Sequence, residues 1–254
     1  MLAGFAVPPA EAQTVDSIKQ KRKLTIGMLV DFPPFGITNA ENKPDGYDAD
    51  VARLMAKQMG VELEIVPVTG PNRIPYLLTN KVDLLVASLG VTPERAKQVQ
   101  FSDAYASIDI GLVAPKKAAI KTPEDLANLR IAVARASTQD TSLTAAAPKT
   151  AKIMRFDDDA SAVQAMLSGQ VDALGLSNVV ARELEKIAPG AYEMKLVLRR
   201  QPNAVALRQG QDDLLAWTNK FIADAKTSGE LNTIHKKWLG TDLPELPKVE
   251  LPKS

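Results

Sequence analysis

VDLLVASLGVTPERAKQVQFSDAY, the stretch from Val82 to Tyr105, decides the fold of this chain. Its apolar first half predicts a short buried strand, and Thr92-Pro93 after it predicts a turn into a short helix. That helix carries Arg95, and the stretch ends on aromatic and acidic residues. A small solute bound at Arg95 would need further contacts, which the loops around this stretch must supply.

The sequence before this stretch predicts a parallel sheet. Apolar runs at residues 24–30 and 61–68 are typical of strands, and the helix between them has Val51 and Met55 on one face and ends at Gly60. We expect Asp48 to cap the start of this helix. With a third strand at residues 81–89, the β-α-β-α-β order indicates a parallel sheet, and ligands of such sheets sit beyond the C-terminal strand ends. Five residues fall in those positions: Phe32, Asn72, Arg73, Ser88 and Gly90.

The second half of the chain repeats this order. Residues 129–133 and 171–176 are typical of strands, and Asp157-Asp158-Asp159 begins a helix that Gly169 ends. The polar turn at Ser137-Thr138 precedes another helix, whose first amides could bind an anion. The apolar run at 108–114 is long enough to leave one domain and enter another, and 204–207 would carry the chain back. The pattern indicates an α/β fold.

Composition excludes several classes of function. The chain has 31 Lys and Arg against 30 Asp and Glu, so its net charge of +1 offers no footprint for nucleic acid. It has no cysteine, which removes disulfides and thiolate metal sites, and its single histidine makes the common zinc and Ser-His-Asp arrangements improbable. We expect no metal and no cofactor, and we interpret Asp157-Asp158-Asp159 as a helix start and His235 as a surface residue.

The first residues predict export. Met1 to Ala12 is apolar, lacks Lys and Arg, and ends in Ala-Glu-Ala, the pattern that signal peptidase cuts. We interpret residues 1–23 as a signal-peptide remnant with a short lead-in, and we expect a periplasmic protein. The alternative is a disordered tag or a start-site artefact. At the other end, the regularly spaced prolines of residues 241–254 predict a loosely held tail.

Three segments are specific enough to indicate a family: Lys81-Val82-Asp83, Thr92-Pro93-Glu94-Arg95 and Phe101-Ser102-Asp103. With them, the chain resembles the solute-binding proteins of polar amino acid ABC importers over about residues 24–240. The resemblance implies a type II two-lobe fold, with a mostly parallel sheet flanked by helices in each lobe and a two-strand hinge. Lobe 1 would comprise residues 24–113 and 204–240, and lobe 2 residues 114–203. The implied partners are a small carboxylate or amino acid and a membrane permease, and we expect a monomer without enzymatic activity.

The resemblance also implies roles for individual residues. The arginine matching Arg95 holds the ligand α-carboxylate, which suits its planar fork of donors. Residues matching Ser88 and Gly90 contact the same carboxylate or the ammonium, and the aromatic matching Phe32 stacks on the ligand side chain. The remaining matches concern carboxylate binding: Ser137 and Thr138 form the turn of the second lobe, and Asn72-Arg73 resembles members whose arginine reaches a distal carboxylate.

Two departures bear on the ligand. Ser177 stands where the family usually has an aspartate that pairs with the ligand ammonium, and Gly70 stands where many members have a large aromatic. With Arg73, Arg95 and no evident acid, the site should favour an anion by Coulomb attraction, so we expect an acidic or polar amino acid.

Three alternatives remain: a binder of a non-amino organic dicarboxylate, a lyase similar to cyclohexadienyl dehydratase, and a sensor domain of a larger receptor. A lyase needs a general acid within reach of the leaving group, and no carboxylate of lobe 2 is expected to enter the cleft at Ser177 or Asn178. A sensor would call for a transmembrane stretch, and the chain shows no such apolar run.

Overall fold

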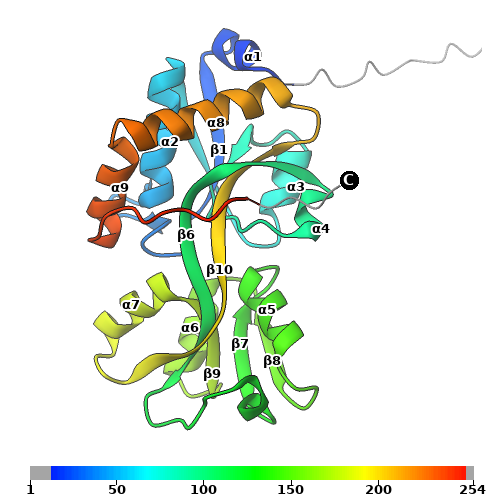
Figure 1. The fold of residues 1–254 in the computed structure, drawn as a ribbon, viewed down its shortest axis with the longest axis vertical. Helices are drawn as coiled ribbons and strands as arrows, with labels where there is room; N and C mark the ends of the chain where they lie inside the picture. Colours follow the sequence, from blue (N-terminus) through cyan, green and yellow to red (C-terminus); the bar gives the residue numbers. More distant parts are fainter. Residues whose placement is uncertain (1–12, 250–254) are drawn as a thin grey trace, which may run out of the picture.

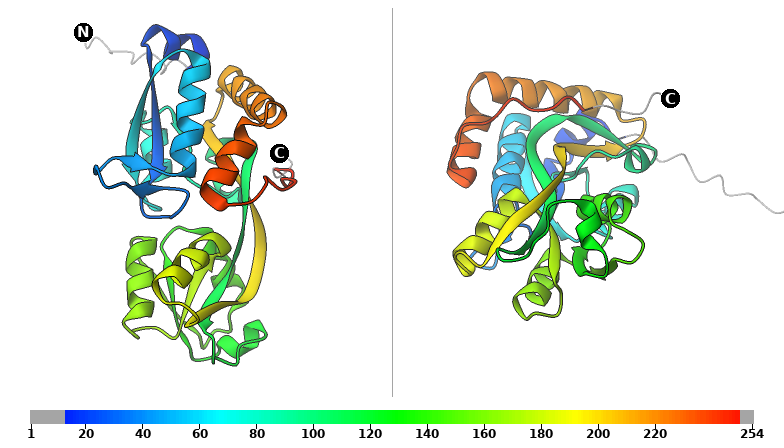
Figure 2. Two further views of the ribbon diagram at one scale, coloured as in Figure 1. Left: turned by 90° about the vertical axis from the view of Figure 1, so that its left-hand side faces the viewer. Right: turned by 60° about the horizontal axis from the view of Figure 1, so that its bottom comes forward.

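The computed structural model describes residues 13–249, so the predicted signal remnant in residues 1–12 lies outside the described part. Two lobes are joined by two long antiparallel strands, β6 (Val99–Pro115) and β10 (Tyr192–Arg208) (Figure 1). Seen from the side, both strands run along one side of the junction (Figure 2). The predicted two-lobe α/β architecture is confirmed.

Lobe 1 has a parallel group of strands at one end of the sheet. β1 (Lys23–Leu29) lies between β4 (Glu62–Val68) and β5 (Leu84–Leu85) and is parallel to both. The helices of this lobe come from both ends of the chain: α1 (Val15–Gln20), α2 (Tyr47–Met59), α3 (Arg73–Leu78), α4 (Pro93–Ala96), α8 (Asp212–Thr227) and α9 (Glu230–Leu239). A small hairpin of β2 (Ile37–Thr38) and β3 (Pro44–Asp45) precedes α2.

Lobe 2 repeats the arrangement with its own parallel strands. β7 (Arg130–Ala134) lies between β8 (Lys152–Phe156) and β9 (Ala173–Ser177). Its helices are the 3-10 turn η1 (Pro123–Leu126), α5 (Thr138–Ala146), α6 (Asp159–Leu167) and α7 (Asn178–Ile187). Hydrogen bonds through β10 and β6 connect both lobes into one eight-stranded sheet, in the order β4-β1-β5-β10-β6-β9-β7-β8.

The passage between the lobes lies within the two long strands. Residues 110–113 of β6 already pair with β9 of lobe 2, so the chain enters lobe 2 before the expected boundary at 113/114. On β10, Ala206 pairs with β5 of lobe 1. The β6–β10 ladder shifts register on both sides of Ala204. Such irregularities let a strand bend locally, which suits a connection between two moving bodies.

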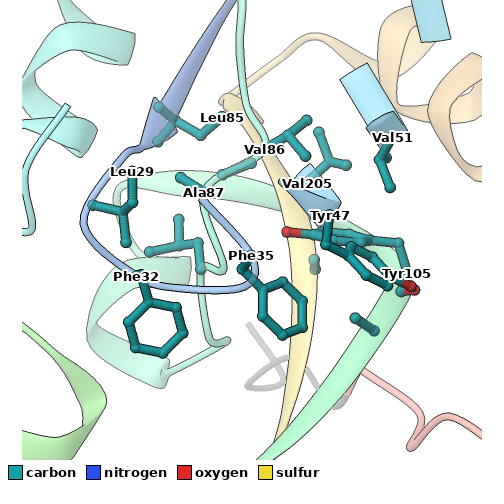
Figure 3. Close-up of a cluster of buried hydrophobic side chains, with 14 of the residues drawn as sticks. Leu29, Phe32, Phe35, Tyr47, Val51, Leu85, Val86, Ala87, Tyr105 and Val205 are labelled. Atoms are coloured by element: carbon teal, nitrogen blue, oxygen red, sulfur yellow. The ribbon is translucent and has the colours of Figure 1, made fainter. Parts of the chain in front are cut away.

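The hydrophobic core of lobe 1 lies directly beneath the loop that follows β1. Figure 3 shows Phe32 and Phe35 on that loop, near Leu29 and Ala87, with Tyr47 and Tyr105 beside them. Phe35 is fully buried and packs on Tyr47 at a centroid distance of 4.8 Å. This apolar floor holds one wall of the space between the lobes in place.

Three expectations from the sequence need correction. The N-cap of α2 is Gly46 rather than Asp48, which lies inside the first turn and is fully buried. His235 is buried as well, because α9 packs on α2 and brings its imidazole edge-on to Tyr47 at 5.8 Å. Residues 241–249 are not loose throughout, since Leu243 packs on the core and its amide donates to Asn232 Oδ1 at 2.7 Å.

Candidate functional site

A small cavity lies where the two lobes meet. Lobe 1 contributes the loop after β1, the start of α3 and the residues after β5, and lobe 2 contributes the N-termini of α5 and α6. Its volume of ≈ 20 Å³ has room for roughly one water molecule. An amino acid therefore requires the lobes to separate before it can enter.

The predicted site residues fall into two groups around this cavity. Five of them line it: Phe32, Arg73, Ser88, Ser137 and Thr138. Four do not: Asn72, Gly90, Arg95 and Ser177. Arg95 and Gly90 adjoin the lining residues through hydrogen bonds, whereas the side chains of Asn72 and Ser177 are used within their own lobes.

Arg95 reaches from lobe 1 across to lobe 2. Thr92 caps α4 by accepting from the Arg95 amide at 3.3 Å, which fixes the start of the side chain. Its guanidinium donates through Nη1 to the Gly90 carbonyl at 2.7 Å and through Nη2 to the Ala136 carbonyl at 2.8 Å. Burial, and then the charges of Arg73 and Arg199, lower the pKa of Arg95 well below its usual value. An anion at this point would relieve that electrostatic cost.

Arg73 approaches the same place from the start of α3. Its side chain is buried, and it donates to the Ala87 carbonyl at 3.0 Å and to the Ala136 carbonyl at 3.4 Å. Burial lowers the pKa of Arg73 to about 10, against the opposing charges of Asp159 and Asp31. Its neighbour Asn72 shapes the turn instead, because the amide oxygen of Asn72 accepts from the Thr69 backbone at 2.9 Å.

The carbonyl of Ala136 is the point on which both arginines converge. Ala136 has a φ of 59°, a left-handed conformation that non-glycine residues rarely adopt. The turn directs its carbonyl toward lobe 1, where two guanidiniums donate to a single oxygen. A carboxylate is the ligand group whose charge and two oxygens suit a pair of guanidiniums.

Ser88 is held by a buried network that sequence reasoning missed. Ser88 has a φ of 45° and donates its hydroxyl to Asp48 Oδ2 at 3.1 Å, while Tyr105 donates to Asp48 Oδ1 at 2.8 Å. Burial raises the pKa of Asp48 to about 7, and the hydrogen bonds oppose that shift. The sequence did contain a signal for this network. Asp48 precedes Val51 by three positions and Met55 by seven, which places its carboxylate on the apolar face of the helix and indicates that it is buried.

Gly90 and Thr138 pack around Gln201, a residue of β10 in the cavity wall. A Cβ at Gly90 would lie 2.3 Å from Gln201 Cδ, so a larger residue there would displace the Gln201 side chain. Thr138 donates its hydroxyl to Gln201 Oε1, and Gln201 donates to Asn203 Oδ1 at 2.7 Å. Ser137 caps α5 by accepting from the Asp140 amide at 3.1 Å.

Ser177 does not line the cavity. Its side chain is fully buried and caps α7, accepting from the Val180 amide at 3.3 Å. A residue that ends a strand and begins a helix has its side chain turned toward the helix amides, which explains the difference from the sequence expectation.

Carboxylates line the cavity at positions other than Ser177 and Asn178, where the sequence predicted none. Asp31 from lobe 1 and Asp157, Asp158 and Asp159 from lobe 2 all line the cavity. The Asp159 amide donates to Asp31 Oδ2 at 3.1 Å, which connects the two lobes. Burial raises the pKa of Asp159 to about 7 and also raises the pKa of Asp31. Asp157 remains exposed at the rim, 3.5 Å from Arg135.

The acids do not form a metal centre. Among residues 13–249, no group of three or more histidine, cysteine, aspartate or glutamate side chains is arranged to hold a metal ion. Within the same residues, no helix is long and apolar enough to cross a membrane.

Two lobes that close over a polar cavity, with charged groups on both walls, define a solute-binding protein of the two-lobe class. The chain belongs to the bacterial extracellular solute-binding proteins, family 3, whose family model matches residues 24–241. The resemblance that the sequence showed to this family is confirmed.

Individual relatives agree with this assignment. The ABC transporter glutamine-binding protein GlnH of Bacillus subtilis (strain 168) is 30% identical over 247 residues, covering 95% of this chain and 90% of that protein. The solute receptor for L-cysteine of Neisseria gonorrhoeae superposes with a TM-score of 0.84 at 33% identity, covering 89% and 94%.

A third relative is the ancestral amino acid-binding protein AncCDT-1, described as a precursor of cyclohexadienyl dehydratase. It superposes with a TM-score of 0.82 at 32% identity, covering 88% of this chain and 98% of that one.

Proposed function

We propose that this protein captures a polar α-amino acid between its lobes and delivers it to the permease of an ABC importer. The observation that carries the proposal is the convergence of Arg73 and Arg95 on the carbonyl of Ala136. When the lobes part, the two guanidiniums lose this shared acceptor and a ligand carboxylate can replace it. Ser88 and the amides at the start of α5 are the further contacts in reach of the same group.

Relatives support an amino acid but do not fix its side chain. The relatives described above are named for glutamine, for L-cysteine and for an amino acid in general, and glutamine and cysteine have only the α-amino acid group in common. The charged side chains on the cavity wall favour a polar ligand over an apolar one, because arginines and aspartates both line it. Acidic amino acids remain within the proposal, with Arg73 as the group that would reach a second carboxylate.

Binding by lobe closure follows from the size of the cavity. A volume of ≈ 20 Å³ excludes every amino acid, so the ligand must enter an opened form. β6 and β10 are the connections along which the opening would take place. We further propose that the protein acts as a monomer in the periplasm, which the extracellular character of the family supports.

A thermal-shift screen tests this function. The panel contains glutamine, glutamate, aspartate, cysteine, cystine, arginine and histidine, with succinate and glutarate as carboxylates that lack an amino group. A ligand at 100 times its dissociation constant stabilises the folded state by about 2.7 kcal/mol. We expect at least one amino acid to raise the unfolding midpoint, and calorimetry then gives its affinity. A panel in which no amino acid raises the midpoint contradicts the proposal.

The screen also separates the two other candidates. If succinate or glutarate raises the midpoint and no amino acid does, the protein binds an organic dicarboxylate. The lyase is favoured by one observation: the pKa of the Asp159 carboxyl lies at about 7 and its side chain lines the cavity, as a general acid requires. Ultraviolet absorbance of an aromatic product, formed from a cyclohexadienyl substrate, detects that activity, and we expect none.

A further inference from the structure

Asp159 is a buried carboxylate, and one of its two oxygens has no hydrogen-bond partner among the described residues. It is the first residue of α6, its side chain is 7% exposed, and it lines the cavity between the lobes. Among residues 13–249, its Oδ1 has no hydrogen-bond partner. The helix does not need this carboxylate, because the preceding Asp158 caps α6 by accepting from the Ser161 amide at 2.7 Å. A buried polar group without a partner is costly, so its retention calls for an explanation.

Asp31 presents a second such oxygen from the opposite lobe. It follows β1, lines the same cavity, and its Oδ1 likewise has no partner within the described part of the chain. The two residues touch through the Asp159 amide, which donates to Asp31 Oδ2 at 3.1 Å. The pair is therefore assembled only when the lobes are together, and its like charges then repel each other.

The surrounding charges show what kind of group would relieve this repulsion. Asp159 and Asp31 are the two carboxylates whose charges act most strongly on Arg73 of α3. Its guanidinium nevertheless donates to the carbonyls of Ala87 and Ala136. At the rim, Asp157 is paired with Arg135 at 3.5 Å, and Asp158 adds a further negative charge to the wall. A second cation beside the carboxylate pair would be bonded by both Oδ1 atoms.

An α-amino acid supplies that cation at the required place. Its ammonium and carboxylate share one carbon atom, so the two charges bind at neighbouring positions. The cavity wall carries both signs, because Arg73 and the carboxylate pair all line it and act on one another electrostatically. An ammonium has three donors and no acceptor, which suits two carboxylate oxygens that lack partners.

We propose that Asp31 and Asp159 form a binding site for the ligand's α-ammonium group that is completed by closure of the lobes. This inference rests on the proposed function and narrows it to ligands that carry a free amino group. Asp159 and Asp31 perform the task for which the sequence suggested an acid at position 177. Because each lobe supplies one carboxylate, the ammonium also favours the closed arrangement over the open one.

Calorimetry with matched ligand pairs tests the inference. The probes are L-glutamine against glutaramate, L-cysteine against 3-mercaptopropionate, and L-glutamate against glutarate, each pair differing only by the amino group. We expect the unmodified protein to bind at least one amino acid about 100-fold more tightly than its partner, as for other buried charge pairs. Equal affinity within every pair would overturn the inference.

Three variants assign the effect to residues. Asp159→Asn and Asp31→Asn keep the side-chain volume and remove the charge, and each should weaken amino acid binding by about tenfold or more. Both variants should bind the deaminated partner within about threefold of the unmodified protein. Asp224→Asn, on the exposed surface of α8 and outside the cavity lining, is the control and should change neither affinity. Thermal unfolding of each variant shows that it is folded.

The pH dependence gives an independent readout. The deprotonated carboxylate attracts the ammonium, and the pKa of Asp159 in the protein is raised to about 7 by burial and by Asp31. Affinity for the amino acid should therefore fall as the pH decreases from 8 to 6, and Asp159→Asn should flatten this profile. Asp31 and Asp158 raise the pKa of Asp159 and Arg73 lowers it, so these groups must be left unchanged in the comparison.

The outcomes separate the two proposals. Amino acid binding that is unaffected by both asparagine variants overturns the ammonium site and leaves the proposed function standing. A protein that binds none of the amino acids in the thermal-shift panel contradicts both.

Discussion

The two lobes bring different sets of charged and polar groups to the space between them and hold them in different ways. Lobe 1 brings Arg73 and Arg95 from separate elements, and a buried carboxylate at Asp48 holds Ser88 behind them. Lobe 2 brings Asp159 and Ser137 from the first turns of two helices, where capping side chains fix the backbone. Asp31 is the one acid that lobe 1 adds. A ligand that carries both charges therefore bridges the lobes, while a ligand with one charge engages mainly one of them.

Removal of the Arg95 guanidinium should have the largest effect on the affinity for the ligand. Arg95→Ala deletes both the donor to a ligand carboxylate and the contact with Ala136, and we expect the amino acid affinity found in the screen to fall by about 2–5 kcal/mol. Calorimetry measures the loss. Arg130→Ala removes an exposed arginine that pairs with Asp172 in lobe 2, and it should leave the affinity unchanged. Retained affinity in Arg95→Ala would remove the arginine from the site.

The contact between the lobes can be tested at Gly70. A Cβ there would lie 2.7 Å from the Arg135 carbonyl of lobe 2, and Gly70 is not in a left-handed conformation that alanine would strain. Gly70→Ala should therefore keep lobe 1 intact but hinder closure, which weakens ligand binding by about 1–3 kcal/mol, the usual cost of overpacking. Small-angle scattering with saturating ligand should show a larger radius of gyration than the unmodified protein. Identical affinity and radius would mean that the lobes close differently.

The buried network of lobe 1 predicts a pH-dependent stability. The pKa of Asp48 is raised to about 7 in the folded protein, above its ordinary value of 3.8. Between these two pH values the folded state therefore holds a proton on Asp48 that the unfolded state has lost. The free energy of unfolding should then decrease as the pH rises from 4 to 7, by at most about 1.4 kcal/mol per pH unit for this group.

Urea denaturation at several pH values measures this slope. Asp48→Asn should reduce it, and Asp224→Asn on the exposed surface of α8 should not. Asp159, whose pKa is also raised to about 7, acts in the same direction, so the double variant should show the smallest slope. An unchanged slope in Asp48→Asn would show that Asp48 keeps its charge in the folded protein.

The smallest effect on binding is expected at Ser177. Ser177→Ala removes the cap of α7 and should lower stability by about 1 kcal/mol. Its side chain does not line the cavity, so the affinity for the amino acid should stay within about twofold. Chemical denaturation and calorimetry on the same samples separate the two quantities. A tenfold loss of affinity would place Ser177 in the site.

The sequence predicted the frame of this site better than its charge. The turn and the short helix that carry Arg95 were predicted, because local rules determine helix starts. The approach of Asp31 to Asp159 could not be predicted, since the two residues are 128 positions apart and meet only through the packing of two lobes. Ser177 was placed correctly at a strand end, yet its hydroxyl turns to a helix amide, a choice that strand periodicity does not reveal.

The left-handed turn at Ala136 affects the apparent dissociation constant, and so the lowest solute concentration at which the protein is loaded. Its carbonyl occupies donors of both arginines, so an incoming carboxylate competes with a group of the protein itself. If only one molecule in 100 has these donors available, the apparent dissociation constant is about 100-fold weaker than the intrinsic one. Because this contact joins the two lobes, it stabilises the closed form of the empty protein and is lost when the lobes part. A single backbone carbonyl thereby lowers the affinity that the two arginines would otherwise give.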